Sequence, residues 1–530
     1  MRTLVAFLVL SSAAAAQSTI TVTGKVFYED RTYTAAGFTG ALVNRPVRQA
    51  EIDLMNSAGD TILGSGITDE NGAYSLSFFG FHQDARVRIS SQRMDGTGKM
   101  RIAVLDRPSA NAVYAVQGPV LNTMTKPVFD DLVVTKAGFG GAFNIFDCAV
   151  KSFQYLASIE ASLSDPAPVL TIYWEPGSTN GTYFDGSVPA IFLLGKTSDP
   201  DEYDDDIILH EIGHWVAVNF SKDDTPGGAH AITDLLDPRL SWSEGWAHYW
   251  SAVVRVYSNA NVFAGEYVPY LQVDNFLSGG QPDNGVFDLE GPSFPTFTLT
   301  ARNEVAVAAI LWDLADPPNE SFDVVVPLEG QIWISVHGQI PGRTNITLED
   351  FHEGLVAQGL FMPDISGSPT SVRIFNAREV RYYADPSEPN TDPLTAPTIS
   401  GLVTLRTFYG SGDADWYTVV APAGKLVIET LNLKDGADTK LELYDSTGVT
   451  LIASDDNGGP TAKASRITQS VKTPTTFRLK VLEVDSIVEF GTYDLQVQTT
   501  KGGGGGHGGC GLTGFEGLVF LAFLRRIRRR

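Results

Sequence analysis

The chain has 530 residues, of which 43% are hydrophobic and 19% are charged. This length exceeds what one hydrophobic core normally organises, so we expect roughly two to four domains. The 52 glycines favour strands and turns over a helical bundle. A formal net charge of -24 argues against nucleic acid or anionic membranes as partners, because phosphate groups attract surplus Lys and Arg.

The N-terminus has the order of a secretory signal. A single arginine precedes an apolar run over 4–10, and small residues follow up to Gln17. The apolar run is too short to span a bilayer. We therefore predict a signal peptide over 1–16 and a secreted or cell-surface protein exported by a bacterium. The alternative is an ordinary N-terminal strand.

Residues 17–119 alternate between apolar and polar positions, as in "TITVTGKVFYED" and "GAYSLSFF". Turn residues recur about every ten positions, which predicts an antiparallel β-sandwich. The stretch "RPVRQAEIDLMNSAGDTILGSGITDENGAYSLSF" resembles the carboxypeptidase-regulatory-like modules. That resemblance implies a fold and no chemistry.

Residues 120–384 change to helical spacing. Apolar residues recur every three or four positions in "FNIFDCAVKSFQYLASIE", and further helices are predicted in "DDDIILHEIGHWVAVNF", "SWSEGWAHYWSAVVRVY" and "NEVAVAAILWDLA". Between the first two, "VLTIYW" and "AIFLLG" read as strands. We predict one α+β domain here, so that the expected fold is multidomain, with a central α+β unit flanked by two β-sandwiches.

Residues 385–397 read as a linker and 398–500 as a second β-sandwich. The phrases "GDADWY" and "LELYDSTG" resemble the bacterial pre-peptidase C-terminal domain. Carboxylates in its turns are candidate Ca²⁺ ligands, because hard cations prefer clustered oxygens, although Asp-rich turns are also common without metal. The candidates are Asp413, Asp415, Asp438, Asp455 and Asp456.

The C-terminal residues 501–530 begin with glycines and Cys510 and end with a short apolar run and an arginine cluster. This order resembles the sorting signals of bacterial surface proteins, which implies that export and sorting machinery bind the two termini. Only one other cysteine, Cys148, occurs in the chain. A disulfide framework is therefore excluded.

The most informative stretch is "LHEIGHWVAVN" at 209–219. In a helix His210 and His214 are one turn apart, so both imidazoles leave the same face and can share one metal ion. Zn²⁺ is the ion that this H-E-x-x-H spacing serves, and Glu211 lies where it can take a proton from the metal-bound water. The alternative is a core helix with two satisfied histidines, which would bury polar groups at a cost.

A catalytic zinc requires a third protein ligand. Glu244 in "SWSEGWAHYW" lies on the next predicted helix and can reach back across a loop. "HEIGHW" followed by "SEGWA" resembles the thermolysin and fungalysin branch of the gluzincin metallopeptidases. The resemblance assigns His210, His214 and Glu244 to zinc and Glu211 to the general base. The metzincin class of metallopeptidases is excluded, because the chain lacks the continuation H-E-x-x-H-x-x-G-x-x-H.

The chain departs from the gluzincin pattern four positions after the ligand glutamate. The family usually has an aspartate there that holds the first zinc histidine, and this chain has His248. His248 either forms a hydrogen bond to a zinc ligand from outside the metal site or faces solvent. Candidates for stabilising the oxyanion are His230, Tyr249 and His337. We also expect "AIFLLG" to be a sheet edge to which a peptide substrate adds as a strand.

The function that these residues predict is zinc-dependent hydrolysis of protein or peptide substrates. One alternative is a non-catalytic surface adhesion or binding protein with a zinc site, for which the intact Glu211 would have no use. Another is a zinc hydrolase that acts on bonds other than peptide bonds.

Overall fold

The computed structural model of the chain describes residues 17–501, except for 35–36, 125–127, 164–167, 259–268, 273–276, 279–280, 283–284, 291–298, 318–320, 324–326, 361–369, 411 and 489. The predicted signal peptide over 1–16 and the predicted sorting tail from 502 onward lie outside the described residues. Within the described residues, no helix is both long enough and apolar enough to cross a membrane.

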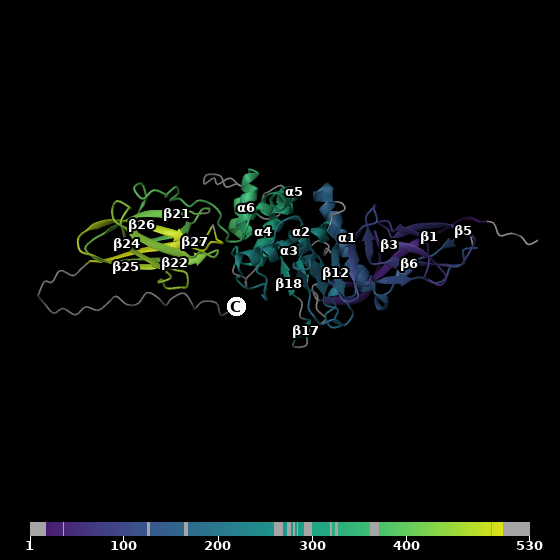
Figure 1. Cartoon of the computed structure of the whole chain (residues 1–530). Helices are drawn as coiled ribbons and strands as arrows, with labels where there is room; N and C mark the ends of the chain where they lie inside the picture. The colour runs from purple at the N-terminus through teal and green to yellow at the C-terminus, as the bar shows by residue number, and fades with distance from the viewer. Residues whose placement is uncertain are drawn as a thin grey trace, which may run out of the picture.

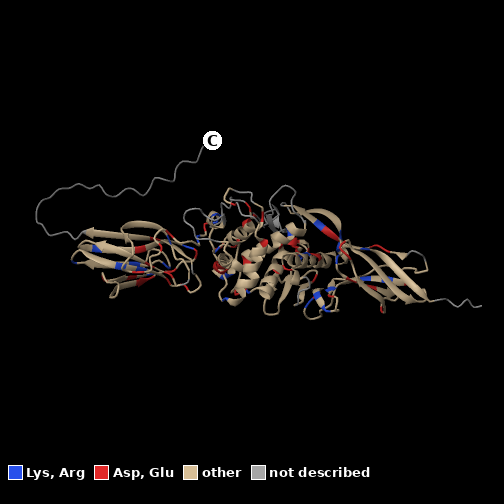
Figure 2. Cartoon of the chain, turned by 90° about the horizontal axis from the view of Figure 1, so that it is seen from above, with Lys and Arg blue, Asp and Glu red and all other residues tan. Residues whose placement is uncertain are grey.

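The chain is elongated and has three parts in sequence order. Strands of the N-terminal part lie at one end, a helical part lies in the middle, and strands of the C-terminal part lie at the other end (Figure 1). Figure 2 shows the same order from a second direction. The structure is therefore multidomain, with several β-sheets and a group of helices between them.

The N-terminal part contains two sheets. In the first, β1 pairs with four other strands, and in the second the strand order is β4-β3-β6-β9. The bounds are β1 (Ser18–Thr34), β2 (Gly37–Pro46), β3 (Glu51–Asn56), β4 (Ile62–Ile67), β5 (Ala73–Gly80), β6 (Ala85–Ser90), β9 (Ala115–Gln117), β10 (Val128–Phe129) and β11 (Leu132–Val134). Alternate residues of β1 and β5 are buried, as the alternation in the sequence predicts for half-buried strands.

The central part has a mixed sheet with the order β13-β14-β12-β8-β7. Its strands are β7 (Gln92–Met94), β8 (Met100–Leu105), β12 (Leu170–Trp174), β13 (Tyr183–Asp185) and β14 (Ala190–Leu193). The expectation that "AIFLLG" forms the edge is wrong, because β14 lies between β12 and β13. The edge strand is β13.

The division between 17–119 and 120–384 does not coincide with a break in the structure. β7 and β8 come before residue 119 but belong to the central sheet, where β8 runs parallel to β12. β10 and β11 come after residue 119 but pair in parallel with β1. Parallel pairing joins strands that are far apart in the chain, and no turn signal marks it in the sequence.

Helices cover the central sheet. α1 (Gly140–Ile159), α2 (Asp205–Phe220), α3 (Pro238–Ser258) and α4 (Glu304–Ala315) are the main ones, and their apolar residues share one core with the N-terminal strands. The smaller elements are α5 (Glu329–Trp333), α6 (Leu348–Ala357), α7 (Thr370–Ala377), the π-turn η4 (Ile334–Gln339), the 3₁₀ turns η1 (Lys136–Gly138), η2 (Ala161–Leu163), η3 (Asp201–Tyr203) and η5 (Ile340–Gly342), and the strand pairs β15 (Pro269–Gln272) with β18 (Gly285–Asp288) and β16 (Leu277–Ser278) with β17 (Gln281–Pro282).

The C-terminal part is a two-sheet sandwich with a core of its own. The sheet orders are β19-β21-β26-β23-β24 and β20-β27-β22-β25. The strands are β19 (Thr398–Ile399), β20 (Gly401–Thr407), β21 (Ala414–Ala421), β22 (Gly424–Lys434), β23 (Thr439–Tyr444), β24 (Leu451–Asp456), β25 (Arg466–Val471), β26 (Thr475–Glu483) and β27 (Thr492–Lys501).

The sandwich contacts the central part through an aromatic cluster. The ring of His352 in α6 lies 5.2 Å from that of Tyr382 and 5.5 Å from that of Phe490, measured between centroids. The backbone N–H of Phe490 also donates to Oε1 of Glu349, at 2.9 Å. His352 is thus buried where the two parts meet, and this burial lowers its pKa to about 3.

The buried His352 predicts an acid-sensitive fold. An unfolded histidine has a pKa of about 6.5, so between that pH and about 3 the unfolded chain binds a proton that the folded chain does not. The free energy of unfolding should therefore fall as the pH falls through this window, by up to about 1.4 kcal/mol per pH unit from this group. His352→Leu should reduce the difference in unfolding free energy between pH 7 and pH 5, measured by chemical denaturation. Equal differences in wild type and variant would contradict this.

Candidate functional site

Helix α2 carries the H-E-x-x-H residues and begins at a well-defined cap. The Asp204 side chain accepts hydrogen bonds from the backbone N–H groups of Asp206, at 3.0 Å, and Ile207, at 3.2 Å. Carboxylates in the first turn also suit the positive end of the helix dipole. The absence of proline and the apolar residues of α2 let the helix run buried from its first turn to Ala217.

Two buried cations fix that first turn to the neighbouring helices. Arg255 of α3 lies 2.5 Å from Asp206, and both side chains are fully buried. Lys151 of α1 lies 3.5 Å from Asp205 and 3.2 Å from Asp147. Removing one partner of such a pair would leave an uncompensated buried charge, so α2 cannot shift along its axis at low cost.

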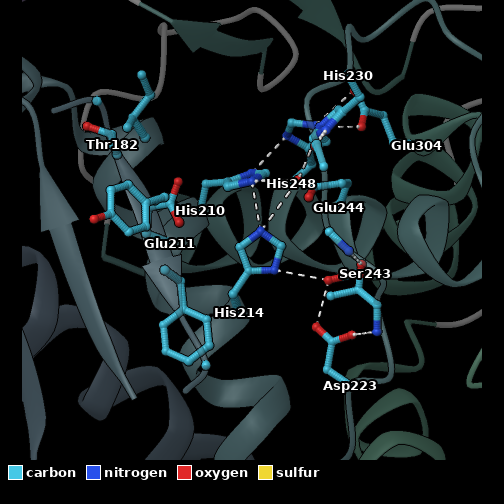
Figure 3. Close-up of a pocket in the computed structure, with 18 of the residues that line it drawn as sticks. Thr182, His210, Glu211, His214, Asp223, His230, Ser243, Glu244, His248 and Glu304 are labelled. Carbon is cyan, nitrogen blue, oxygen red and sulfur yellow. Dashed lines mark hydrogen bonds and ion pairs between the residues drawn. The ribbon is translucent and has the colours of Figure 1, made fainter. Parts of the chain in front are cut away.

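Three candidate metal ligands converge beside α2. His210 Nε2 lies 3.2 Å from His214 Nε2 and 3.1 Å from Oε2 of Glu244 on α3, and His214 Nε2 lies 3.4 Å from the same oxygen (Figure 3). Ligand atoms about 2.05 Å from a tetrahedral zinc would be separated by about 3.3 Å. The donor set and its spacing therefore fit zinc.

The electrostatics of this cluster are those of a cation site. Burial and the neighbouring His248 lower the pKa of His210 to about 4. Although burial acts in the opposite direction, His214 and His210 hold the pKa of Glu244 well below its usual range. Burial acts to lower the pKa of His214, but Glu244 raises it to about 9, so a metal ion that binds here must displace a proton from His214.

Glu211 lies on the same helix and faces strand β13. It is 8% exposed, and the backbone N–H of Phe184 in β13 donates to its carboxylate. Burial raises the pKa of Glu211 to about 7, and the nearby Glu244 adds to that rise while His214 opposes it. A carboxylate with a pKa near neutrality can both accept and release a proton at physiological pH.

The far side of each candidate metal-binding imidazole contacts a polar side chain that leads to a carboxylate. His210 Nδ1 lies 3.2 Å from Nδ1 of His248 on α3. His214 Nδ1 lies 3.2 Å from the hydroxyl of Ser243, which donates at 2.6 Å to Asp223. Such contacts fix the tautomer and the orientation of an imidazole.

His230 and Glu304 form the opposite wall of the cleft. His230 Nε2 lies 3.3 Å from Oε2 of Glu304 and 3.7 Å from Oε2 of Glu244. The contact with Glu304 raises the pKa of His230 to about 9. Burial acts to raise the pKa of Glu304, but His230 and His248 lower it to about 2. A cationic imidazole is thus paired with a carboxylate beside the cluster.

The structure places the other sequence candidates outside the cleft. Tyr249 is buried on the other face of α3, where it contacts Tyr155. His337 in η4 stacks on Trp333 with 5.1 Å between the ring centroids, and its Nδ1 lies 2.5 Å from the backbone oxygen of Phe220. Of the three oxyanion candidates, only His230 lines the cleft.

Three residues of the site were not predicted from the sequence. Asp223 lies in the loop after α2, Ser243 precedes the candidate ligand Glu244, and Glu304 begins α4. Only Glu304 carries a sequence signal, since it is the one carboxylate in the first turns of an otherwise apolar helix. The cleft that these residues line has a volume of about 1100 Å³, with β13 on one side and His230 on the other.

These observations describe a multidomain protein whose central cleft gathers histidines and glutamates on three helices. Residues 159–331 match the family described as the mycolysin C-terminal domain. The matched stretch contains the whole of α2, α3 and α4, and thus every residue of the cluster. The chain therefore has a peptidase-associated architecture. No curated protein matches it.

Several solved structures are similar to parts of the chain. The pre-peptidase C-terminal domain of a collagenase from Bacillus anthracis is 22% identical over 19% of this chain and 90% of that one, with a TM-score of 0.16. PliG, a periplasmic lysozyme inhibitor from Aeromonas hydrophila, is 10% identical over 19% and 94%, with a TM-score of 0.15. A Paenibacillus cycloisomaltooligosaccharide glucanotransferase is 10% identical over 89% and 72%, with a TM-score of 0.13. At these TM-scores, no conclusion follows from the likenesses.

Gly245 lies where helices α3 and α4, which form walls of the site, pack closely against each other. A Cβ at this position would lie 2.5 Å from Val307 and 2.9 Å from the backbone oxygen of Glu304, both on α4. Gly245→Ala should therefore push α3 and α4 apart and lower the free energy of unfolding by about 1–3 kcal/mol, measured by chemical denaturation. Gly330→Ala is the matched control, because nothing lies within 4 Å of its added Cβ. Equal stability of the two variants would contradict the prediction.

Proposed function

We propose that the protein is a zinc-dependent peptidase with a gluzincin-like centre. The observation that supports this most strongly is the triangle formed by His210, His214 and Glu244, whose ligand atoms are 3.1–3.4 Å apart. In this proposal these three residues hold the zinc. The ion, when bound, supplies a Lewis acid that polarises a carbonyl and acidifies water.

Glu211 is the proposed general base. Its carboxylate lies in the cleft on the same helix as both histidines, and its pKa of about 7 suits a group that must gain and lose a proton in each cycle. Glu211 takes a proton from the attacking water and passes it to the nitrogen of the leaving amine. No covalent bond between the protein and its substrate is required.

The edge strand β13 is the proposed site for an extended substrate. It pairs with β14 on one side, and its residues Tyr183 and Phe184 line the cleft next to Glu211. A peptide that adds to this edge would hydrogen-bond to the backbone and would place a peptide bond between Glu211 and His230. The cationic His230 then stabilises negative charge on the substrate oxygen.

Two other functions compete with peptide hydrolysis. A surface adhesion protein would have no use for a buried carboxylate of raised pKa between two metal-binding histidines. A zinc hydrolase of another class would not require an open strand edge beside the metal. The cleft offers both features. The proposed substrates are therefore proteins or peptides, met outside the cell after export.

A second proposed cation is Ca²⁺, at the junction of the linker and the C-terminal sandwich. Ligand atoms of Glu388, Asp413 and Asp415 lie within 4.8 Å of one another, and the buried side chain of Asn390 lies beside Asp415. Burial raises the pKa of all three carboxyls. A hard cation would relieve this crowding.

The other calcium candidates from the sequence do not belong to that group. Asp455 accepts hydrogen bonds from the backbone N–H groups of Gly458 and Arg466, which is the pattern of a turn. Asp456 follows it on the edge strand β24. Asp438 lies 3.7 Å from Lys463 and thus has a cation already.

Exchanging two glutamates separates their proposed roles. Glu211→Gln removes the base and keeps the ligands, so about one zinc per chain should remain while casein hydrolysis falls by ~10²-fold or more. Glu244→Ala removes a ligand, so zinc should be lost and hydrolysis should fall with it. Metal analysis and casein cleavage measure both. Retained zinc and activity in Glu244→Ala would rule out the gluzincin-like centre.

Calcium should stabilise the C-terminal sandwich. If free Ca²⁺ exceeds its Kd 100-fold, the free energy of unfolding should rise by about 2.7 kcal/mol, and a chelator should remove the gain. Asp415→Asn should abolish the response in thermal unfolding. Asp455→Asn, a carboxylate of the same sandwich outside the group, should preserve it. A response that survives Asp415→Asn would place the ion elsewhere.

A further inference from the structure

Glu304 is a buried carboxylate that faces two histidines of the cleft. It opens α4 directly after the cap residue Asn303 and is 1% exposed. Its Oε2 lies 3.3 Å from His230 Nε2, and its Oε1 lies 4.0 Å from His248 Nε2. Each carboxylate oxygen is thus directed to a different imidazole (Figure 3).

Such a residue is costly to keep for stability alone. The described polar contacts of the two Glu304 oxygens are those with the imidazoles of His230 and His248. The remainder of α4 is almost entirely apolar and fully buried. A carboxylate in this environment destabilises the fold unless cations or N–H groups face it. The two imidazoles supply that compensation, and both belong to the proposed zinc site.

We infer that Glu304 is a positioning residue that orients His248 behind the zinc ligand His210 and His230 at the substrate side. This inference rests on the proposed zinc peptidase. Glu304 itself touches neither the ligand atoms nor the substrate, so it acts through the two histidines. A single buried group would then couple metal retention to stabilisation of the substrate oxygen.

The first branch of this inference is the contact of Glu304 with His248, and it follows from the tautomers of the histidines. If His210 uses Nε2 as a metal ligand, its proton must be on Nδ1, which lies 3.2 Å from Nδ1 of His248. His248 then accepts through Nδ1 and carries its own proton on Nε2, the atom that faces Glu304. The carboxylate favours this tautomer of His248 and so favours the ligating form of His210.

The second branch is the contact of Glu304 with His230, which fixes the orientation of a loop residue. His230 lies between α2 and α3, and its Nδ1 is 3.0 Å from the backbone oxygen of Gly228. Its Nε2 is held by Glu304. The two contacts engage both ring nitrogens of a histidine that a loop alone would leave free to rotate. Glu304 thereby holds the imidazole ring of His230 at the wall of the cleft opposite β13.

A second metal ion is the competing explanation. His230, Glu244 and Glu304 lie close enough together to hold one. In that case, Glu304 would be a ligand rather than a positioning residue. Counting zinc ions per wild-type chain distinguishes the two explanations, since the positioning role requires one zinc and the competing role requires two.

The test is a pair of double-mutant cycles on the full chain. Glu304→Gln should weaken zinc affinity by ~10 to 100-fold, the usual effect of a lost outer contact, and should lower kcat at saturating zinc without a matching rise in KM. In the His248→Ala background, Glu304→Gln should have no further effect on zinc affinity. In the His230→Ala background, it should have no further effect on kcat.

A bypass variant tests the first branch alone. His248→Asp places a carboxylate next to His210, so it should restore the zinc affinity of Glu304→Gln without restoring its kcat. Asp313→Asn is the matched control. This carboxylate is buried in the same helix and pairs with Arg378, at 2.9 Å. Its loss should lower the unfolding temperature and leave zinc affinity unchanged.

Glu304→Asp is a second variant for the case that Glu304→Gln does not fold. It keeps the negative charge but shortens the side chain, so the carboxylate moves away from the two histidines. It should show the same losses with a smaller change in unfolding temperature. Additive effects in both cycles, unchanged zinc affinity in both Glu304 variants, or two zinc ions per wild-type chain would overturn the inference. A wild-type chain that binds no zinc would instead overturn the proposed function on which it rests.

Discussion

The buried ion pair between Asp206 and Arg255 is the constraint on which the central part depends. It joins the first turn of α2 to the last turns of α3, with both side chains removed from solvent. Asp205 and Lys151 do the same between α2 and α1. Because the charges cannot separate without an unpaired charge in the core, the three helices keep one register. His210, His214 and Glu244 meet because that register is fixed at a distance from them.

Two glycines let the helices that the ion pairs hold in register also pack closely together. Gly213 of α2 faces the backbone of Ala247 on α3, and Gly245 of α3 faces Val307 on α4. At both crossings a side chain of any size would separate the helices. The close approach brings Glu304 within reach of the histidines, and so the walls of the cleft come from three different helices. Charge sets the register of the helices, and small residues set their separation.

The sequence predicts the parts of this arrangement that are local. The spacing of His210 and His214 places them on one face of a helix, and the alternation in 398–500 indicates strands. Contacts such as those of Glu304 with His230 and His248 join residues 56 or more positions apart through helix packing, and no spacing rule reports them. The parallel pairing of β8 with β12 was missed for the same reason. The edge strand β13 was missed because its three residues are too few to show a period.

The two sandwiches differ in a way that their sequences do not show. Both alternate, and both read as appended modules. In the structure the C-terminal sandwich has its own core, whereas the N-terminal strands share theirs with α1, α2 and α3.

This difference decides which part evolution or an engineer can exchange. A recombination junction within 385–397 would pass between two cores, and it would have to preserve contacts such as those of Phe490 with His352 and Glu349, of Asp435 with Ala301 and of Lys434 with Glu379. A junction near residue 119 would cut through two sheets, because β8 lies on one side of it and β12 on the other. The C-terminal sandwich is therefore a transferable unit, and the N-terminal strands are inherited with the helices that carry the cleft.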